Sequence, residues 1–178
     1  LPFVKIDPSH SGAILAFQRF FPEKKIPLLL CYVEDRDLWA WKLPDSKEVS
    51  AALRSYPQDF EIWSTINQEL SGSGYTAFVD EGIAILRSQA QQIESILKNA
   101  FKIKIAGLPE PVFAVNSPIF QSELGEALAM QSKIGVGAVF FDLEDKRVFS
   151  LRSRGLGNVA KVAKLNGGGG HPKAAGYS

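Results

Sequence analysis

Apolar residues recur with a helical period over the first part of the chain. Those within 13–21 stop before Pro22, which cannot continue a helix, so we predict a helix there with Ser9 as its N-cap. A second apolar run covers 26–33 and leads directly into four charged residues at 34–37. The pattern therefore predicts a mainly helical N-terminal piece.

Two short helices and one long helix are predicted next. Residues 44–46 introduce one short helix, and Asp59 caps the other. No proline interrupts 75–101, where apolar residues recur near the helical period, so we expect a long helix that could bridge two lobes. The residues that we place on the apolar faces of the short helices are Val49, Ala52, Leu53, Tyr56, Ile62, Trp63 and Ile66.

The pattern changes after Gly107 to a mixture of strands and helices. The predicted elements are a strand at 111–115, a helix at 121–130, paired strands at 136–141 and 148–151, and a helix from its cap Asn158 to Leu165. The fold class is therefore α/β. We expect a helical piece at 1–70, a helical linker at 71–105 and a small α/β domain with a mixed sheet at 106–178.

Composition narrows the classes of function. The 178 residues are 46% hydrophobic and 22% charged, which is ordinary for a globular protein. The net charge of +1 gives no bulk attraction to duplex DNA or anionic lipid, so any affinity for phosphate must be local. The single Cys31 can form neither an internal disulfide nor a thiolate metal cluster.

The ends of the chain bear on location. No stretch reaches the roughly 20 apolar residues that span a bilayer, and residues 1–8 lack the layout of a signal peptide. We therefore expect an intracellular, cytoplasmic protein that does not bind membranes. The chain begins at Leu1 rather than methionine, so we expect missing upstream residues, which leaves an organelle-targeting segment open.

Four consecutive glycines, Gly167–Gly170, precede His171 and form the strongest local signal. Without side chains, their amides can converge on an anion while the histidine donates a hydrogen bond to it. The alternative is a flexible C-terminal linker or a helix cap. The run is not a P-loop, because no Gly-Lys-Ser/Thr follows.

Three carboxylates, Glu34, Asp35 and Asp37, follow an apolar run directly. This is how ligands for hard cations are delivered to a buried edge. The alternative is a solvated helix end at which Arg36 pairs locally.

The glycine segment resembles the hallmark of the C-terminal domain associated with DHH phosphoesterases, in 168–171 followed by Ala174-Ala175-Gly176. Ser150-Leu151-Arg152-Ser153 and Val159-Ala160 reproduce the order found in that family. Asn158 departs from it, since the family commonly has aspartate there. The resemblance extends to most of the chain, through 11–13, 32–39, 115–117 and 122–125.

The resemblance implies hydrolysis of phosphoester or phosphoanhydride bonds with two manganese or magnesium ions. The first three metal motifs have no counterpart here, and the fourth contributes an aspartate, for which Asp35 is the best match and Asp37 the fallback. Asp35 would thus be a catalytic metal ligand. Arg152, His171 and the amides of Gly168, Gly169 and Gly170 would hold the substrate phosphate between the domains, and the chain alone should be inactive.

The family resemblance implies a phosphorylated substrate or partner without selecting one. Short single-stranded oligonucleotides, dinucleotides, nucleotide phosphates and polyphosphate are all compatible, and a homodimer is left open. One alternative is a non-catalytic phosphate- or RNA-binding module, because similar domains occur beside alanyl-tRNA synthetase domains. Another is a degenerate member that recognises phosphate and has lost catalysis.

Overall fold

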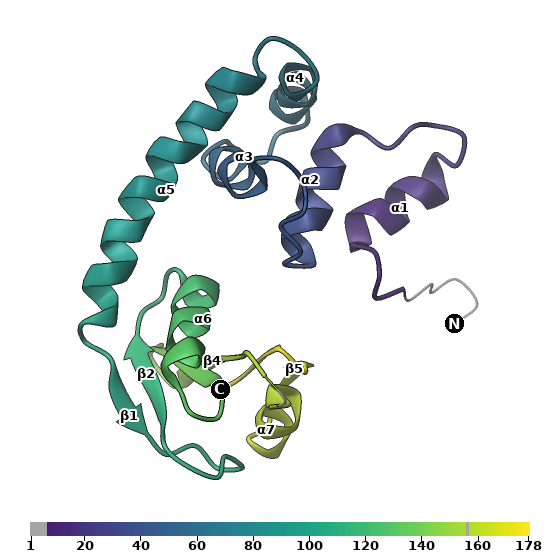
Figure 1. Cartoon of the computed structure of the whole chain (residues 1–178). Coiled ribbons are helices and arrows are strands. Elements are labelled where there is room, and N and C mark those ends of the chain that lie inside the picture. The colour runs from purple at the N-terminus through teal and green to yellow at the C-terminus, as the bar shows by residue number, and fades with distance from the viewer. Residues whose placement is uncertain (1–6, 156) are drawn as a thin grey trace. The chain divides into compact units, whose positions relative to one another are not determined.

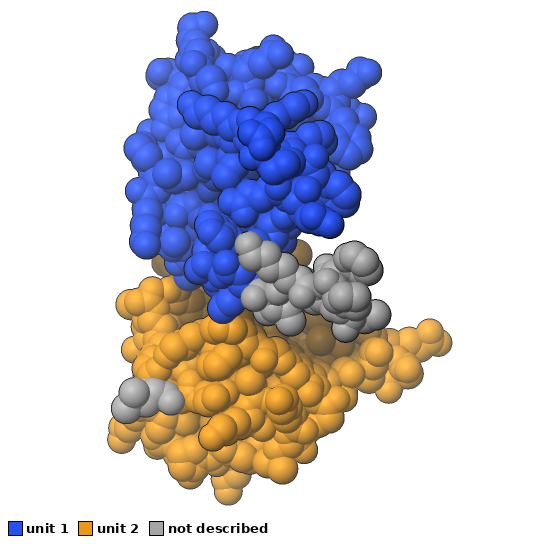
Figure 2. Space-filling model, turned by 90° about the vertical axis from the view of Figure 1, so that its right-hand side faces the viewer, with its two compact units in different colours: residues 1–89 blue, residues 90–178 orange. Residues whose placement is uncertain are grey.

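The computed structural model describes residues 7–155 and 157–178, and the chain divides into two compact units (Figure 1). Unit 1 comprises Leu1–Gln89 and unit 2 comprises Ala90–Ser178, coloured separately in Figure 2. The division falls inside one continuous helix, in the region predicted as a linker. Residues 1–6, part of the segment that lacks a signal-peptide layout, lie outside the described residues.

Unit 1 is helical, as the periodicity predicts. Its helices pack around a buried cluster that includes Leu29, Tyr32, Val49, Ile66 and Phe78. The helices are α1 (Gly12–Phe20), α2 (Leu28–Asp37), α3 (Ser46–Leu53), α4 (Phe60–Leu70) and the first part of α5 (Tyr75–Leu97). No helix among the described residues is both long and apolar enough to cross a membrane.

Asp59 and Ser9 were predicted as helix caps in unit 1, and only the first prediction is confirmed. Asp59 caps α4 by accepting hydrogen bonds from two backbone N–H groups of the first turn, as predicted. The cap of α1 is Ser11, whose hydroxyl accepts from the Ile14 N–H at 3.3 Å, and not Ser9. Ser9 instead donates its backbone N–H to the carboxylate of Asp7, because it lies two residues before the capping position.

Unit 2 is an α/β fold with a six-stranded mixed sheet, which confirms the predicted class. The strand order is β1-β2-β3-β4-β6-β5, with β2 and β3 parallel and the other neighbours antiparallel. The strands are β1 (Phe101–Ile103), β2 (Val112–Asn116), β3 (Val136–Asp142), β4 (Arg147–Ser153), β5 (Gly169–His171) and β6 (Ala174–Tyr177). The sequence did not predict β1, β5 or β6.

Helices α6 (Gln121–Gln131) and α7 (Val159–Leu165) cover opposite faces of this sheet. Helix α6 packs through Leu124 and Leu128 against Val115 and Val139. Helix α7 packs on a second cluster that contains Leu151, Ala163 and Ala175. The face that a residue of β4 or β6 presents is therefore fixed by the strand register, since side chains alternate along a strand.

Close helix packing in unit 1 requires Gly82, because a Cβ there would lie 2.0 Å from the Glu48 carbonyl oxygen. Gly82→Ala should therefore destabilise unit 1 by about 2–3 kcal/mol, since the opposing atom is backbone and cannot rotate away. Urea unfolding followed by far-ultraviolet circular dichroism measures this. Gly72→Ala is the control, because its nearest neighbour would lie at 3.4 Å. Equal midpoints for the two variants would contradict the packing.

Candidate functional site

Strand register brings Arg152 and His171 into one row across three strands. Arg152 of β4 pairs with Ala174 of β6, and Ala174 pairs on its other side with His171 of β5. Residues in register project from the same face of a sheet, and two strand spacings of roughly 4.8 Å separate the outer pair. The two side chains predicted to hold phosphate therefore lie on one face with a small residue between them.

The next row on that face consists of Ser150, Gly176 and Gly169. A Cβ built on Gly169 would have no other atom within 4 Å, so the space above this glycine is open. Small residues thus form the floor between a serine, an arginine and a histidine. We call these two rows, Ser150, Arg152, Gly169, His171, Ala174 and Gly176, the Arg152 patch.

The Arg152 side chain is held against the first turn of α6. Its aliphatic stem passes over Gly125, where a Cβ would lie 2.7 Å from Arg152 Cγ. Nη2 donates to the Ser122 hydroxyl at 2.8 Å, and Nη1 donates to the Leu151 carbonyl at 3.0 Å. Burial lowers the pKa of Arg152 and the nearby Glu123 carboxylate raises it, yet a guanidinium stays protonated at neutral pH.

The start of α6 adds to the positive potential of the patch. The Ser150 hydroxyl donates to Gln121 Oε1 at 2.8 Å, which ties β4 to the first residue of the helix. The N–H groups of a first helical turn have no partner within the helix and carry partial positive charge. Glu123 in the same turn is the counter-charge. The arrangement suits an anion that can displace water from Arg152.

His171 is placed by the turn between β5 and β6. The Pro172 carbonyl accepts from the Val159 N–H at 3.0 Å, and the Lys173 carbonyl accepts from the Ser153 N–H at 3.0 Å. Nδ1 of His171 accepts from the Lys173 N–H at 3.4 Å. In the neutral ring the proton is then on Nε2, so the exposed nitrogen is a hydrogen-bond donor.

The glycines at 167–170 have different structural roles. Gly167 has a φ of +83° and ends α7, and the Gly168 N–H donates to the Ala163 carbonyl at 2.8 Å. The helix-cap alternative therefore applies to these two residues. The Gly168 amide is used within the fold and is not offered to a ligand as the resemblance implied. Of the three glycines named for binding, Gly169 and Gly170 belong to β5.

Asp35 lies in unit 1, at the C-terminal end of α2, and is 7% exposed. Its carboxylate accepts from the Lys42 N–H at 2.9 Å, the Leu43 N–H at 3.2 Å and the Ser46 hydroxyl at 2.5 Å. Burial alone would raise its pKa, but these hydrogen bonds lower it. The alternative that these carboxylates form a solvated helix end is therefore wrong for Asp35. It applies to Asp37, which is exposed.

The donor set around Asp35 does not fit a two-metal centre. Among residues 7–155 and 157–178, no group of three or more His, Cys, Asp or Glu side chains is placed to hold a metal ion. The two carboxylate oxygens of Asp35 instead accept hydrogen bonds from backbone N–H groups and a hydroxyl group. A cation would have to displace these donors. We therefore derive no chemical step through a metal.

Sequence reasoning missed the residues that support Arg152. Ser122 and Gly125 belong to the segment that carries the family resemblance, yet nothing in their local pattern assigns them to an arginine thirty residues away. Ser150 was detectable, because residues two apart on a strand share a face. Apart from its small side chain, nothing in the sequence marked Ala174 as part of the site.

Comparisons with known proteins find one curated relative and several structures. No family model matches the chain. The uncharacterized protein R106 of Acanthamoeba polyphaga mimivirus is 30% identical over 174 residues, which are 94% of this chain and 41% of that protein. The chain thus spans less than half the length of this relative.

The similar solved structures include two with phosphoesterase-related descriptions. A pGpG-specific phosphodiesterase, PggH from Vibrio cholerae, is 11% identical and covers 96% of this chain and 67% of its own, with a TM-score of 0.47. An exopolyphosphatase-related protein from Bacteroides fragilis is 17% identical over 68% of this chain and 38% of its own, with a TM-score of 0.35. At these TM-scores the likeness supports no inference about activity.

The glycine run predicts a contrast between two neighbouring substitutions. Gly168→Ala should lower stability by about 2–3 kcal/mol, because its Cβ would lie 2.1 Å from the Gly176 carbonyl oxygen. Gly169→Ala should change stability by less than about 1 kcal/mol, because its Cβ would meet open space. Thermal unfolding of both variants tests this. Equal losses would mean that β5 is not placed as described.

Asp35 predicts a pH dependence of stability in unit 1. Its pKa is lowered from 3.8 on folding, so its contribution is present above that value and is lost as the pH falls through the lower folded-state pKa. Asp35→Asn should cost about 2–3 kcal/mol at pH 7 and less at about pH 3, where the parent has begun to lose this contribution. Urea unfolding at both pH values measures this difference.

The exposed Asp37→Asn variant is the control, since it changes the same charge one residue beyond Arg36. A stability difference between parent and Asp35→Asn that does not shrink in acid would contradict the role of the ionised carboxylate.

Proposed function

We propose that unit 2 binds a phosphate group of a nucleotide or short single-stranded oligonucleotide, as the substrate-binding part of a phosphoesterase like the DHH family that the sequence resembles. The observation that carries the proposal is the row of Arg152, Ala174 and His171 on one face of the sheet. The row unites an arginine and a histidine that lie 19 positions apart in the sequence.

The chemistry of the row suits a phosphate. A guanidinium presents a planar fork that can donate two parallel hydrogen bonds to phosphate oxygens, and each charge-assisted bond contributes roughly 1.5–3 kcal/mol. The Nε2 proton of His171 supplies a second donor across the row. Ala174 between them leaves room for an oxyanion to approach both groups.

Small residues extend the patch beyond the phosphate position. The open space over Gly169 and the bare backbone of Gly176 would let a sugar or base lie against the sheet. A nucleotide or the end of a single strand fits this chemistry, and dinucleotides, nucleotide phosphates and polyphosphate all share the phosphate that Arg152 would hold.

The proposal gives this chain a binding role and no catalytic step. Hydrolysis assisted by manganese or magnesium needs ligands beyond those that the described residues supply. A second candidate, a non-catalytic phosphate- or RNA-binding module, is favoured by that same observation and by the structural use of Asp35. Both candidates require the Arg152 patch to bind phosphate.

Replacing Arg152 should weaken phosphate binding. For a 5′-phosphorylated dinucleotide, Arg152→Gln should raise the Kd about 10- to 100-fold, because the loss of one or two charge-assisted bonds is worth that factor. Isothermal titration calorimetry at low salt measures it. Arg147→Gln is the matched control, because Arg147 is on the same strand, faces the other side of the sheet and pairs with Asp142.

A nucleoside, which carries no phosphate at all, should bind the parent and Arg152→Gln equally. His171→Ala should weaken binding of the phosphorylated ligand, and His171→Gln should weaken it less because the amide keeps a donor. Equal affinity of Arg152→Gln and Arg147→Gln would contradict the proposal, provided that both variants melt like the parent.

The purified chain should show no manganese-dependent hydrolysis of dinucleotides. The expectation follows from the lack of a metal-holding group among residues 7–155 and 157–178. Chromatographic product analysis with and without a chelator tests it. Turnover that requires manganese and disappears on Asp35→Asn substitution would restore Asp35 as a metal ligand and exclude the non-catalytic candidate.

A further inference from the structure

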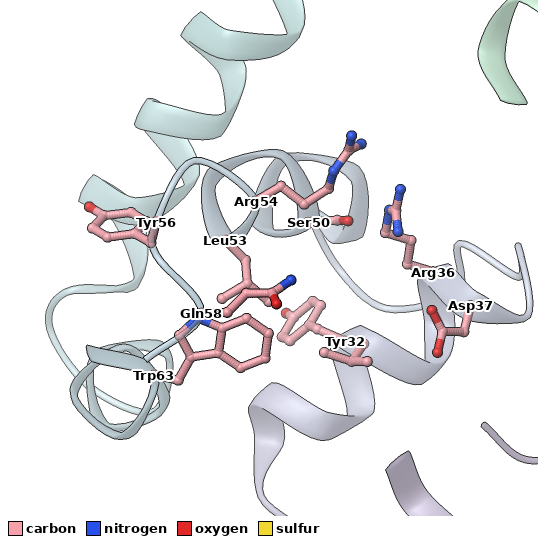
Figure 3. Close-up of a pocket in the computed structure, with 10 residues that line it drawn as sticks. Tyr32, Arg36, Asp37, Ser50, Leu53, Arg54, Tyr56, Gln58 and Trp63 are labelled. Atoms are coloured by element: carbon pink, nitrogen blue, oxygen red, sulfur yellow. The ribbon is translucent and has the colours of Figure 1, made fainter. Parts of the chain in front are cut away.

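Unit 1 contains a cavity of about 340 Å³ that belongs to none of the residues predicted for phosphate binding. It is lined by residues of α2 and α3, by the segment after α3, and by Trp63 of α4 (Figure 3). All of these residues lie within a single compact unit. Its lining combines aromatic, cationic and amide side chains, which are groups that can recognise a ligand.

Two aromatic rings line the cavity, and their polar atoms are already bonded elsewhere. The Trp63 Nε1–H donates to the Pro57 carbonyl at 2.9 Å, and the Tyr32 hydroxyl donates to the Pro44 carbonyl at 3.0 Å. Tyr32 is only 3% exposed and belongs to the core of unit 1, so the ring surface that the cavity offers a ligand is that of the half-buried Trp63. Ring surface of this kind stacks on flat aromatic molecules.

The charged residues of the wall favour an anion. Arg36 and Arg54 both line the cavity, against the single carboxylate of Asp37. Figure 3 shows the two guanidinium groups on the same side of the cavity, next to Ser50. The positive charge of Arg54 on this side of the cavity attracts an anion. Arginine also binds phosphate through paired hydrogen bonds.

A neutral amide completes the set of recognition groups. Gln58 lines the cavity and lies beside the Tyr32 and Trp63 rings in Figure 3. Within the part of the chain that the structure describes, the side chains of Gln58 and Arg54 form no hydrogen bond. A side-chain amide has a donor and an acceptor side by side, which matches the edge of a heterocyclic base.

We propose that this cavity binds a nucleoside monophosphate, with the base against Trp63 and the phosphate at Arg54. The volume is at the low end of the roughly 300–1,000 Å³ range of small-molecule sites, which suits one nucleotide and not an oligonucleotide. This site is separate in its residues from the Arg152 patch. It would give the chain a second, mononucleotide-sized ligand in addition to the one proposed for unit 2.

The test is nucleotide binding to the full chain in an Arg152→Gln background, which weakens the Arg152 patch. Guanosine and adenosine 5′-monophosphate, the parent nucleosides and inorganic phosphate are titrated by calorimetry, and tryptophan fluorescence is recorded in parallel. We expect saturable binding of at least one monophosphate, weaker binding of its nucleoside and of phosphate, and a change in fluorescence on binding.

Arg54→Gln should weaken monophosphate binding about tenfold or more, in line with the loss of a charge-assisted bond. Arg87→Gln is the matched control, because Arg87 is an exposed arginine of α5 that does not line the cavity. Gln58→Ala should weaken binding of the nucleotide without altering the weak binding of phosphate. Gln58 and Arg54 are both exposed, so neither change should impair folding.

Three results would overturn the proposal. They are the absence of saturable binding by either monophosphate, equal affinity in the Arg54→Gln and Arg87→Gln variants, and equal affinity for inorganic phosphate and the nucleotide. The last result would remove the aromatic component on which the assignment of a nucleotide rests.

Discussion

The close approach of the glycine run to strand β6 is the constraint on which the candidate site depends. Gly168 and Gly170 lie where a Cβ would come within 2.1 and 2.6 Å of backbone atoms of Gly176 and Ala175. Only because both lack side chains can β5 pair with β6. That pairing in turn places His171 in register with Ala174, and so on the same face as Arg152. Gly168 and Gly170 thus allow the two strands to pair, and Gly169 leaves the space above β5 open to a ligand.

The sequence predicted the longer elements because their signals are local. Helices α4, α6 and α7 and the β3–β4 pair follow from apolar periodicity, from the caps Asp59 and Asn158, and from β-branched and aromatic runs. Strands β5 and β6 were missed because they are short and rich in glycine and alanine, which are poor strand formers. Their pairing is decided by tertiary packing rather than by local preference.

The candidate site was predicted only in part, for the same reason. Arg152 and His171 were found from a motif, and their common face required the register of three strands. Asp35 shows the opposite case. A buried carboxylate after an apolar run is compatible with a metal ligand or with an anchor for a following loop. The choice depends on donors at Lys42, Leu43 and Ser46, whose positions local sequence does not specify.

The central claim is that phosphate binds across β4, β6 and β5, and mapping of backbone amides by nuclear magnetic resonance tests it most directly. With a ¹⁵N-labelled chain and a 5′-phosphorylated dinucleotide, the account predicts that the largest shifts occur at Gly169, His171, Arg152 and the first turn of α6. Gly168 should shift less, because its N–H is bonded to Ala163. Shifts confined to unit 1, or none in β5 at saturation, would contradict the account.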